Sequence, residues 1–453
     1  MGSEVTIIEE KNIGGTCLNK GCIPSKIMKT TADLFLKFKE AENFGISLKG
    51  SFVPDLIRLM KRKQKIIDIQ QKGILNLFKK SHIKFEKGRG FIKDKGLITI
   101  KNDDNKKDIA FDKLIIATGT EPLNILDFPF DGKTILSSND LLELKEIPES
   151  IMIVGAGVIG CEFANILSAL GSTVTIVEGM DRILPLFSVD ESCASILTRE
   201  MKKRKIKIIT NQTVKKTQKN GKMLCVTLGD SPFLNNTHKK KIKHQTFEVE
   251  KMAVCIGRSP LSKKMGFKNI SLKTDDKGWI PVNNKMETNI KGVYAIGDIL
   301  GPSKIMLAHV ASHEGMVAAE NALGGNKTMN YNAVPSAIFT MPEIGNVGIS
   351  EAQAIKQNID IQCTSVNFRA LGKAHVIGEI AGQAKIIAEK SNGKILGVHI
   401  IGPHATDLIA QATLAINKGM SVSDIANTIH AHPTLAEIMA EVSLKGSGIA
   451  LHG

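Results

Sequence analysis

The sequence is poor in aromatic residues and contains no long hydrophobic run. Only two tyrosines and one tryptophan occur among 453 residues, which leaves little aromatic surface on which nucleic-acid bases could stack. No run of 18 or more apolar residues is present, and a membrane-spanning helix requires such a run. The N-terminus also lacks a basic stretch followed by an apolar core and a cleavage site, so no secretory signal is visible. We therefore expect neither a nucleic-acid partner nor a membrane partner.

Cysteines and acidic residues are scarce as well. Seven cysteines in so long a chain are too few for a disulfide scaffold, and together with the missing secretory signal they favour a cytoplasmic location. The 60 lysines and arginines outnumber the 45 aspartates and glutamates, which gives a formal net charge of +15. Because the lysines are spread along the chain, a solvated basic surface explains this charge better than a nucleic-acid site does, although it could steer an acidic partner protein. The length exceeds what one core supports and indicates three or four domains.

The most informative stretch is GGTCLNKGCIPSK at residues 14–26. Cys17 and Cys22 lie five positions apart, between a glycine pair and a predicted helix, and residues 5–9 before them are typical of a short buried strand. A helix N-terminus and Lys26 would both lower the pKa of a nearby thiol and make it a reactive thiolate. The alternatives are two buried structural cysteines or half of a zinc site. Zinc ligands usually come as closer pairs with a second pair elsewhere, so the pattern favours a redox-active disulfide and no metal site.

A nucleotide fingerprint lies in the middle of the chain. Gly155, Gly157 and Gly160 form a GxGxxG pattern directly after an apolar strand and before a predicted helix, and Glu178 ends the next strand. The three glycines permit a tight turn, close approach of the pyrophosphate and close helix–strand packing. A GxGxxG pattern alone is weak evidence, but this context makes it a strong signal for a dinucleotide. Since Glu178 would accept both ribose hydroxyls and repel a 2′-phosphate, we predict NAD rather than NADP.

A histidine and a glutamate form a third motif near the C-terminus. His432 and Glu437 lie five positions apart around a proline turn, in the stretch HAHPTLAE. Such a pair could act as a general base and the group that orients it. A satisfied structural histidine is the ordinary alternative for a single histidine, but the surrounding residues favour the catalytic pair.

These motifs resemble those of the flavin disulfide reductases, and among them the dihydrolipoamide dehydrogenases, over nearly the whole chain. The resemblance implies an α/β fold with two Rossmann-like dinucleotide-binding domains and a C-terminal α+β dimerisation domain. It divides the chain into an FAD-binding domain (1–145), an NAD-binding domain (146–265), a central domain that returns to the FAD site (266–330) and a dimerisation domain (331–453). The implied cofactors are FAD and NAD, and the implied assembly is a homodimer.

The resemblance also assigns residues to the two nucleotide sites. For FAD it implies Glu9 at the adenosine ribose, Lys26 beside the flavin ring, Asp298 at a ribityl hydroxyl and the backbone of Gly90. For NAD it implies Glu162 near the nicotinamide, where a partner for the helix dipole is the alternative. For one further implied residue, His309, a structural role is equally open. The remaining implied contacts are Thr118, Gly119, Thr120, Val214, Gly257, Met306, Leu307 and Ala308.

The reaction that the resemblance implies is the oxidation of protein-bound dihydrolipoamide by NAD. His432, held by Glu437, takes a proton from the incoming thiol; the thiolate then attacks Cys17 and releases Cys22, which lies against the flavin. The implied partners are the lipoyl carrier domains of 2-oxoacid dehydrogenase complexes or of the glycine cleavage system. In the implied dimer, His432 and Glu437 lie opposite the disulfide of the other subunit.

Three alternative functions stay open at this point. Glutathione reductases use NADPH and favour arginines where Glu178 stands, and mercuric reductases carry a C-terminal cysteine pair that is missing here. A catalytically silent, FAD-deficient homologue is the third, because the first strand and glycine-rich turn of an FAD-binding unit are not found before Glu9. We expect a misplaced start or a truncation, with about 30 residues of that unit upstream of Met1. The chain as written should retain flavin poorly.

Overall fold

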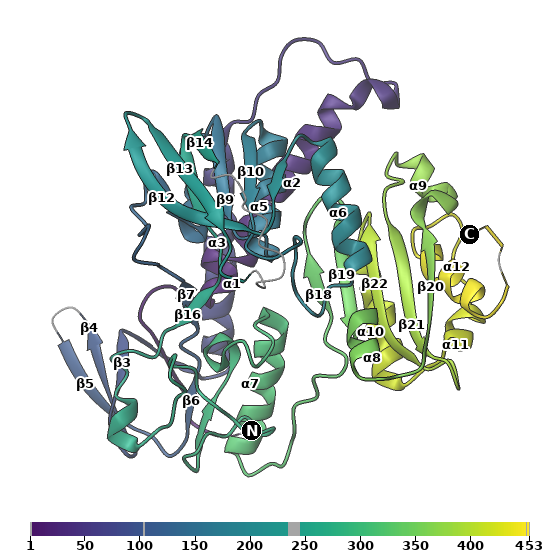
Figure 1. The fold of residues 1–453 in the computed structure, drawn as a ribbon. Coiled ribbons are helices and arrows are strands. Elements are labelled where there is room, and N and C mark those ends of the chain that lie inside the picture. Colours follow the sequence, from purple (N-terminus) through teal and green to yellow (C-terminus); the bar gives the residue numbers. More distant parts are fainter. Residues whose placement is uncertain (1, 103–104, 234–244, 450, 453) are drawn as a thin grey trace. The chain divides into compact units, whose positions relative to one another are not determined.

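The computed structural model describes residues 2–102, 105–233, 245–449 and 451–452. The chain forms two compact units, drawn together in Figure 1. Unit 1 comprises Met1–Met28, Asp55–Leu123 and Gly257–Asn330, and unit 2 comprises Lys29–Pro54, Asn124–Ile256 and Tyr331–Gly453. In the part of the chain that the structure describes, no helix combines the length and hydrophobicity that a membrane crossing needs.

Unit 1 is built from short sheets and long helices. Its strands are β1 (Thr6–Glu9), β2 (Lys84–Lys87), β3 (Arg89–Asp94), β4 (Leu97–Asn102), β5 (Asn105–Ala110), β6 (Leu114–Ile116), β7 (Thr120–Pro122), β16 (Arg258–Pro260) and β17 (Val293–Ala295). Its helices are α1 (Gly15–Lys20), α3 (Leu56–Lys80), α7 (Ala308–Ala322) and the 3₁₀ turns η3 (Phe267–Ile270) and η4 (Gly297–Leu300). Helix α2 (Cys22–Lys39) begins in unit 1 and ends in unit 2.

Parallel pairs bring together strands that lie far apart in the sequence. β1 pairs in parallel with β2, and β6 pairs in parallel with β17, while β3, β4 and β5 form an antiparallel sheet. The prediction that residues 5–9 form a buried strand is partly wrong, because β1 is only half-buried. Among the described residues β1 has a strand neighbour on one side only, so its other edge is not covered by a second strand.

Unit 2 contains two five-stranded sheets. The strands of the first have the order β11-β10-β9-β15-β8, and all its pairs are parallel. β9 is apolar from Ile151 to Val154 and buried on both faces, as strands inside a parallel sheet usually are. The elements of this part are β8 (Ile135–Ser137), β9 (Ser150–Val154), β10 (Thr173–Val177), β11 (Lys207–Ile209), β12 (Gln212–Asn220), β13 (Met223–Asp230), β14 (Thr246–Val249), β15 (Lys251–Val254), α4 (Ser138–Leu141), α5 (Val158–Leu170) and α6 (Glu191–Lys203).

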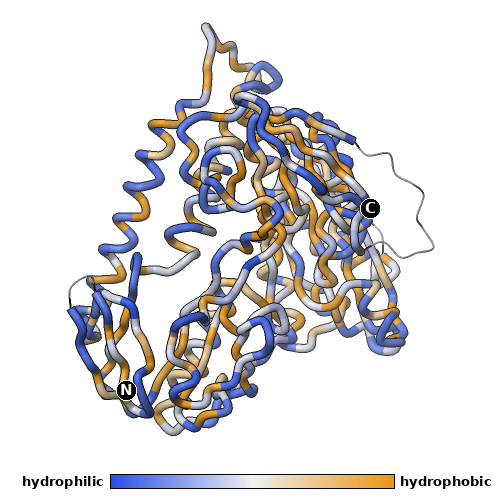
Figure 2. Tube along the Cα trace, turned by 60° about the vertical axis from the view of Figure 1, so that its left-hand side comes forward, coloured by the Kyte–Doolittle hydropathy of each residue, from blue (hydrophilic) through white to orange (hydrophobic). Residues whose placement is uncertain are grey.

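The second sheet of unit 2 is antiparallel throughout, with the order β18-β19-β22-β21-β20. Helices α10 and α12 pack against it, and their apolar faces join the buried residues of β21 and β22 in one core. Figure 2 shows hydrophobic and hydrophilic positions interspersed along helical segments of the chain, as expected for elements with one buried face. The elements are η1 (Ala41–Phe44), β18 (Ser336–Ile338), β19 (Glu343–Gly348), β20 (Ile361–Asn367), β21 (Gln383–Glu389), β22 (Ile395–Gly402), α8 (Glu351–Lys356), η5 (Phe368–Ala370), α9 (Gly372–Val376), α10 (Ala405–Lys418), α11 (Val422–Ala426) and α12 (Glu437–Gly446).

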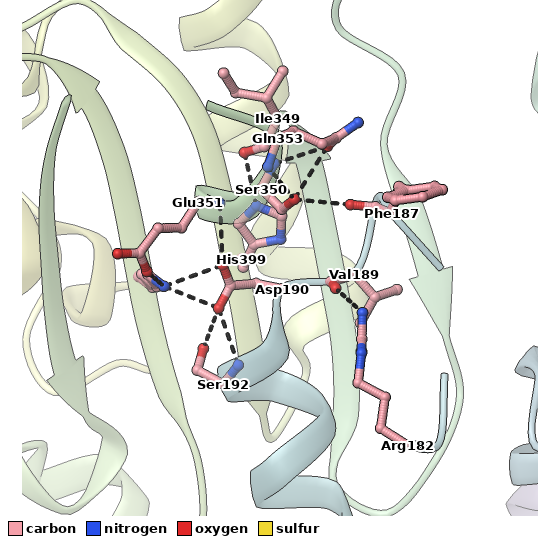
Figure 3. Close-up of polar contacts among 11 residues, drawn as sticks. Arg182, Phe187, Val189, Asp190, Ser192, Ile349, Ser350, Glu351, Gln353 and His399 are labelled. Carbon is pink, nitrogen blue, oxygen red and sulfur yellow. Dashed lines mark hydrogen bonds and ion pairs between the residues drawn. The ribbon is translucent and has the colours of Figure 1, made fainter. Parts of the chain in front are cut away.

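A buried ion cluster joins α6 to the antiparallel sheet of unit 2 (Figure 3). Asp190 caps α6 by accepting the Ser192 N–H, and its carboxylate lies 3.0 Å from the Lys385 ammonium on β21. Lys385 also pairs with Glu351 of α8. His399 of β22 is fully buried beside this cluster and shares a hydrogen bond with the Ile349 carbonyl. The cluster thus ties the N-terminus of α6 to the antiparallel sheet.

Candidate functional site

Cys17 and Cys22 are in contact at the start of α2. Cys17 lies in the short helix α1, Gly21 ends that helix, and Cys22 begins α2. Gly14 has a φ of +94°, a backbone conformation that favours glycine, and a β-carbon there would also lie 2.4 Å from Leu18 Cδ2. A hydrogen bond links the two sulfurs, and no disulfide joins them in the described structure. The sequence prediction that these two cysteines act as a pair is consistent with this geometry.

The pKa of Cys17 differs from the sequence prediction. The hydrogen bond to Cys22 raises the pKa of Cys17 first, and burial of the half-buried sulfur raises it further. The charge of Lys26 acts in the opposite direction but does not outweigh these two effects. The expected lowering of the pKa is therefore wrong for Cys17. Lys26 itself is half-buried on α2, with its ammonium 3.4 Å from the Ser25 hydroxyl.

Several residues predicted for the FAD site lie in unit 1. They offer a ligand either open space or polar groups that can form hydrogen bonds. Glu9 ends β1, and its carboxylate accepts the Lys11 N–H at 2.7 Å. The Thr118 hydroxyl is buried without a hydrogen-bond partner, which is costly unless a ligand supplies one. Gly119 has a φ of +67°, and no atom would lie within 4 Å of a β-carbon there. Gly90 sits in β3, beside the Ile8 side chain of β1. This donor and acceptor set fits a dinucleotide.

A polar network around Asp298 contains one residue that the sequence did not suggest. The Thr120 hydroxyl donates to the Asp298 carboxylate at 3.0 Å. The Arg258 guanidinium donates to both the hydroxyl and the carbonyl of Thr120, and lies 3.8 Å from the Asp298 carboxylate. Arg258 therefore keeps Thr120 and Asp298, the two predicted residues, next to each other. No signal in the sequence pointed to it, since 138 residues separate Arg258 from Thr120.

Helix α7 presents its N-terminus at the end of the predicted FAD segment. The helix begins at Ala308, and Leu307 is its N-cap without a side-chain cap. Uncapped N–H groups and the helix dipole favour negative charge at this end. Met306 and Leu307 are half-buried, whereas Ala308 and His309 are exposed.

Glu314, further along α7, is a second residue that the sequence did not suggest. It is almost fully buried, and its carboxylate accepts the Gly297 N–H at 2.7 Å. Gly297 directly precedes Asp298. Glu314 therefore anchors the backbone that carries the predicted ribityl contact.

The predicted NAD fingerprint in unit 2 has the geometry of a dinucleotide cradle. Gly155 has a φ of +100°, and a β-carbon there would lie 2.5 Å from the Cys255 carbonyl oxygen. A β-carbon at Gly160 would lie 1.9 Å from the Gly155 carbonyl oxygen, so α5 packs tightly on the turn. At Gly157, by contrast, no atom would lie within 4 Å. Two glycines thus serve packing, and the third leaves open space where a pyrophosphate can approach the backbone.

Glu178 is held at the end of β10 by two backbone donors. Its carboxylate oxygens accept the N–H groups of Ala156 and Met180, at 2.6 Å and 2.9 Å. The residue is 8% exposed. Each carboxylate oxygen has two acceptor positions, so one on each stays available for a ribose hydroxyl. Glu9 shows the same contact pattern, because it too accepts the N–H of the residue two positions on.

Three other residues were predicted to contact the cofactors. The structure gives each of them a different environment. Glu162 is buried on α5, and its carboxylate accepts the Phe339 N–H at 2.9 Å, next to β18. The Val214 side chain lies inside the core between β12 and the parallel sheet, so only its backbone can face a ligand. Gly257 belongs to unit 1, has a φ of +134° and leaves space around its α-carbon.

His432 and Glu437 form the predicted pair within unit 2. Nδ1 of His432 lies 2.8 Å from the Glu437 carboxylate, whose other oxygen accepts the Thr434 N–H at 2.8 Å. Burial tends to raise the pKa of Glu437, but the hydrogen bonds from Thr434 and His432 outweigh it and hold this pKa below its ordinary value. The carboxylate therefore stays charged and fixes Nδ1, which leaves Nε2 of a largely exposed ring for a substrate proton.

Comparison with known proteins identifies two family models along the chain. The model described as pyridine nucleotide-disulphide oxidoreductase matches residues 1–315, and the model of the dimerisation domain of the same family matches residues 334–443. Together they cover all the predicted catalytic and nucleotide-binding residues.

Curated relatives and solved structures agree with these models. The chain is 38% identical over 446 residues to a dihydrolipoyl dehydrogenase of Chlamydia pneumoniae, covering 98% of this chain and 92% of that protein. It is 36% identical over 452 residues to a dihydrolipoyl dehydrogenase of Bacillus subtilis, covering 100% and 95%. Its fold matches the crystal structure of LpdA from Mycobacterium tuberculosis with a TM-score of 0.88 and 24% identity, covering 98% of this chain and 94% of that one.

Proposed function

This chain belongs to the pyridine nucleotide-disulphide oxidoreductase family, and from that premise we propose that it is a dihydrolipoyl dehydrogenase. It is an NAD-dependent flavoprotein that oxidises protein-bound dihydrolipoamide to lipoamide. The observation that carries this proposal is the contact between Cys17 and Cys22 at the start of α2, in a chain 36–38% identical over its length to dihydrolipoyl dehydrogenases. The dimerisation domain makes the protein a homodimer.

The chain's own residues account for binding and orientation of two cofactors. Glu9, Thr118 and Asp298 would hold FAD, with Thr120 and Arg258 fixing the Asp298 carboxylate. Gly157 and Glu178 would hold NAD, with space at the glycine for the pyrophosphate and acceptors on the carboxylate for ribose. When bound, FAD supplies the step that converts the electron pair of a reduced dithiol into a hydride for NAD.

The dithiol chemistry falls to four side chains. His432, oriented by Glu437, removes a proton from one thiol of the substrate. In the oxidised enzyme, where Cys17 and Cys22 form a disulfide, the resulting thiolate attacks Cys17 Sγ and breaks the bond to Cys22, which leaves as a thiolate. The second substrate thiol then displaces Cys17 and closes the lipoyl disulfide, and its proton passes to the departing Cys17 sulfur. Two electrons thereby pass from the substrate to the cysteine pair, and the hydrogen bond between the two cysteines stabilises the reduced pair.

We assign the partner by the same reasoning. The substrate is a lipoyl group on a carrier domain, of a 2-oxoacid dehydrogenase complex or of the glycine cleavage system, and the basic surface would attract an acidic carrier. The cytoplasmic location stays a prediction from the sequence. Glutathione reduction with NADPH is less favoured, because a 2′-phosphate would meet the Glu178 carboxylate, and the backbone donors of Ala156 and Met180 hold that carboxylate in place.

Replacement of the second cysteine tests the proposed function. Cys22→Ser removes the leaving thiolate, so turnover with dihydrolipoamide and NAD should fall by roughly three orders of magnitude. Cys363→Ser, at an exposed cysteine of β20, is the matched control and should keep full turnover. Activity is followed as NADH absorbance, and thermal unfolding shows that both variants fold. Unchanged turnover in Cys22→Ser would refute the disulfide relay.

A further inference from the structure

An exposed phenyl ring lies against the backbone that follows Glu178. Phe233 comes shortly after β13 and is 68% exposed. A β-carbon at Gly179 would lie 3.0 Å from Cδ2 of this ring and 3.2 Å from its Cε2. One edge of the ring therefore touches the residue directly after Glu178, while most of the Phe233 surface is open to solvent. The ring offers an open aromatic surface next to the residue that is proposed to hold the ribose of NAD.

Hydrogen bonds fix the short segment that carries Phe233. The Ser231 hydroxyl accepts the Phe233 N–H at 3.2 Å, and Ser231 is 5% exposed. The Ser231 N–H donates to the Asn211 carbonyl at 3.1 Å, and the Asn211 N–H donates to the Met180 carbonyl at 2.9 Å. Because Gly179 lacks a β-carbon, the Ser231 hydroxyl and the phenyl ring can both approach its backbone closely. The chain after β13 is therefore tied to the chain after β10.

The covalent structure of NAD places its adenine beside Glu178. In the proposed NAD site, Glu178 holds the hydroxyls of the adenosine ribose, and the pyrophosphate approaches the backbone at Gly157. The base is attached to C1′, the carbon next to the one that carries the 2′-hydroxyl, whereas the pyrophosphate is attached on the other side of the sugar, through C5′. The adenine therefore lies past Glu178 as seen from Gly157, where the chain continues with Gly179.

The start of β12 supplies backbone near the same position. Its first residue is Gln212, whose N–H donates to the Glu178 carbonyl at 3.2 Å. The register of β12 on β13 shifts between Val214 and Lys216, so Lys215 has no residue opposite it. A bulge of this kind leaves backbone groups outside the ladder, and Val214 is a predicted cofactor contact. Since a base is held by hydrogen bonds to its edge and by stacking on its face, the bulge and the phenyl ring together would supply both.

We propose that the Phe233 ring stacks on the adenine of NAD and adds to the affinity for the dinucleotide. The proposal rests on the proposed function, which supplies NAD as the ligand, and it names a residue that the GxGxxG pattern does not include. Every nucleobase has a flat aromatic face, and aromatic side chains stack on it in an offset arrangement. Stacking on the base does not sense a 2′-phosphate, so Phe233 adds affinity while the fixed Glu178 carboxylate selects NAD over NADP.

Removal of the ring tests the stacking through affinity. In Phe233→Ala the dissociation constant for NADH should rise at least about fivefold, because stacking of one base on an aromatic side chain contributes that much or more. The dissociation constant for AMP, which is the adenosine half of NAD, should rise by the same factor. Reduced nicotinamide mononucleotide lacks the adenosine, so its dissociation constant should not change. Phe233→Tyr keeps an aromatic face and should bind NADH as the wild type does.

Phe187→Ala is the matched control. Phe187 is 75% exposed and belongs to the same unit, and the Lys356 ammonium of α8 lies 5.6 Å from the centre of its ring. This variant should bind NADH, AMP and the mononucleotide as the wild type does. Titration calorimetry on the full chain measures the dissociation constants, and thermal unfolding shows that the variants fold.

A tryptophan in place of Phe233 reports the stacking directly. Trp279, the one tryptophan of the chain, is 8% exposed and gives a constant background. In Phe233→Trp, AMP should quench the emission of the introduced indole, because the adenine stacks on it. In Phe187→Trp, AMP should leave the emission unchanged.

Several outcomes would overturn the proposal. Unchanged NADH and AMP dissociation constants in Phe233→Ala, or unquenched emission in Phe233→Trp, would mean that the adenine lies elsewhere. Tighter binding of NADH by Phe233→Ala would mean that the ring obstructs the site, and an equal loss for the mononucleotide would mean that the ring acts through the fold of the domain. Failure of the wild-type protein to bind NADH would overturn the proposed function itself, and the stacking with it.

Discussion

At the scale of single residues, the parts of the site that are close in sequence were predictable and the distant partners were not. Cys17 and Cys22, like His432 and Glu437, are five positions apart, so a local motif contains both members of each pair. Arg258 and Glu314 hold Asp298 and its neighbour from segments that no spacing rule connects to them. The raised pKa of Cys17 was also missed, because it depends on the contact between the two sulfurs and on the burial of Cys17.

The charge of Asp190 leads to a prediction about how stability depends on pH. Burial alone would raise its pKa, but hydrogen bonds from Ser192 and Lys385 lower it from 3.8 to about 2. Because the native pKa lies below the unfolded value, the charged carboxylate stabilises the fold above pH 4, and this stabilisation is lost as pH falls towards 2. Asp190→Asn should therefore cost about 2 kcal/mol near neutral pH and progressively less in acid.

Urea unfolding at a series of pH values measures this difference. The control is Asp407→Asn, because the Asp407 side chain is 83% exposed and its loss should change stability little at any pH. A difference between Asp190→Asn and wild type that stayed constant down to pH 2 would contradict the assigned ion cluster with Lys385 (Figure 3).

At the scale of elements, strand–turn–helix units were predicted well, and isolated strands were not. The fingerprint unit appears as β9, the glycine turn and α5, although α5 begins at Val158 and so includes Gly160. Residues 111–120 contain an apolar run, yet only the short strands β6 and β7 form there, with a break in regular structure between them and Ile115 exposed. An apolar run shows that a strand can form, but its length depends on partners such as β17, nearly 180 residues away.

Substitutions at Gly157 and Gly160 distinguish the ligand-binding role of the fingerprint turn from its packing role. Gly157 has a φ of −70° and empty space around it, so Gly157→Ala should fold like wild type, within about 0.5 kcal/mol. Its methyl group would occupy the space left for the pyrophosphate, and the affinity for NAD should fall at least about tenfold. Gly160→Ala should instead lose more than about 2 kcal/mol of stability, because the methyl group collides with the Gly155 carbonyl.

Thermal unfolding and titration calorimetry with NAD distinguish these two effects. A Gly157→Ala variant that bound NAD as wild type does would mean that the pyrophosphate lies elsewhere, and a stable Gly160→Ala variant would mean that α5 packs less closely on the turn than the structure shows.

At the scale of the whole molecule, family and fold followed from the motifs, while the division of the chain into units did not. The α/β fold with a dimerisation domain is confirmed by the family models and the structural match. The four domain ranges stay predictions. Unit 1 collects three separate segments, and unit 2 takes up residues 29–54 between the first two. Hydrophobic patterns report local burial, so they do not reveal that a short segment such as residues 29–54 belongs to a different unit from the segments on either side of it.

Residues proposed to act together reside in different units, which leads to a prediction about the dimer. In the proposed site, Cys17 and Cys22 of one subunit act with His432 and Glu437 of the other. A chain carrying Cys22→Ser and a chain carrying His432→Gln should each be inactive as a homodimer. In the heterodimer, one of the two sites combines the native cysteines of one chain with the native histidine of the other. Its turnover should therefore be about half that of wild type.

Co-expression with two different affinity tags isolates this heterodimer, and NADH formation measures its turnover. If each site were built within a single chain, both sites of the heterodimer would lack one essential residue, and the heterodimer would be as inactive as the two parent homodimers. A heterodimer of Cys22→Ser with Glu437→Gln serves as a second pair, because Glu437 acts only through His432. It should recover a similar share of activity, since its one complete site again has a native histidine and a native orienting carboxylate. Recovery in both pairs would place the catalytic base of each site on the opposite subunit and would make dimerisation a condition for turnover.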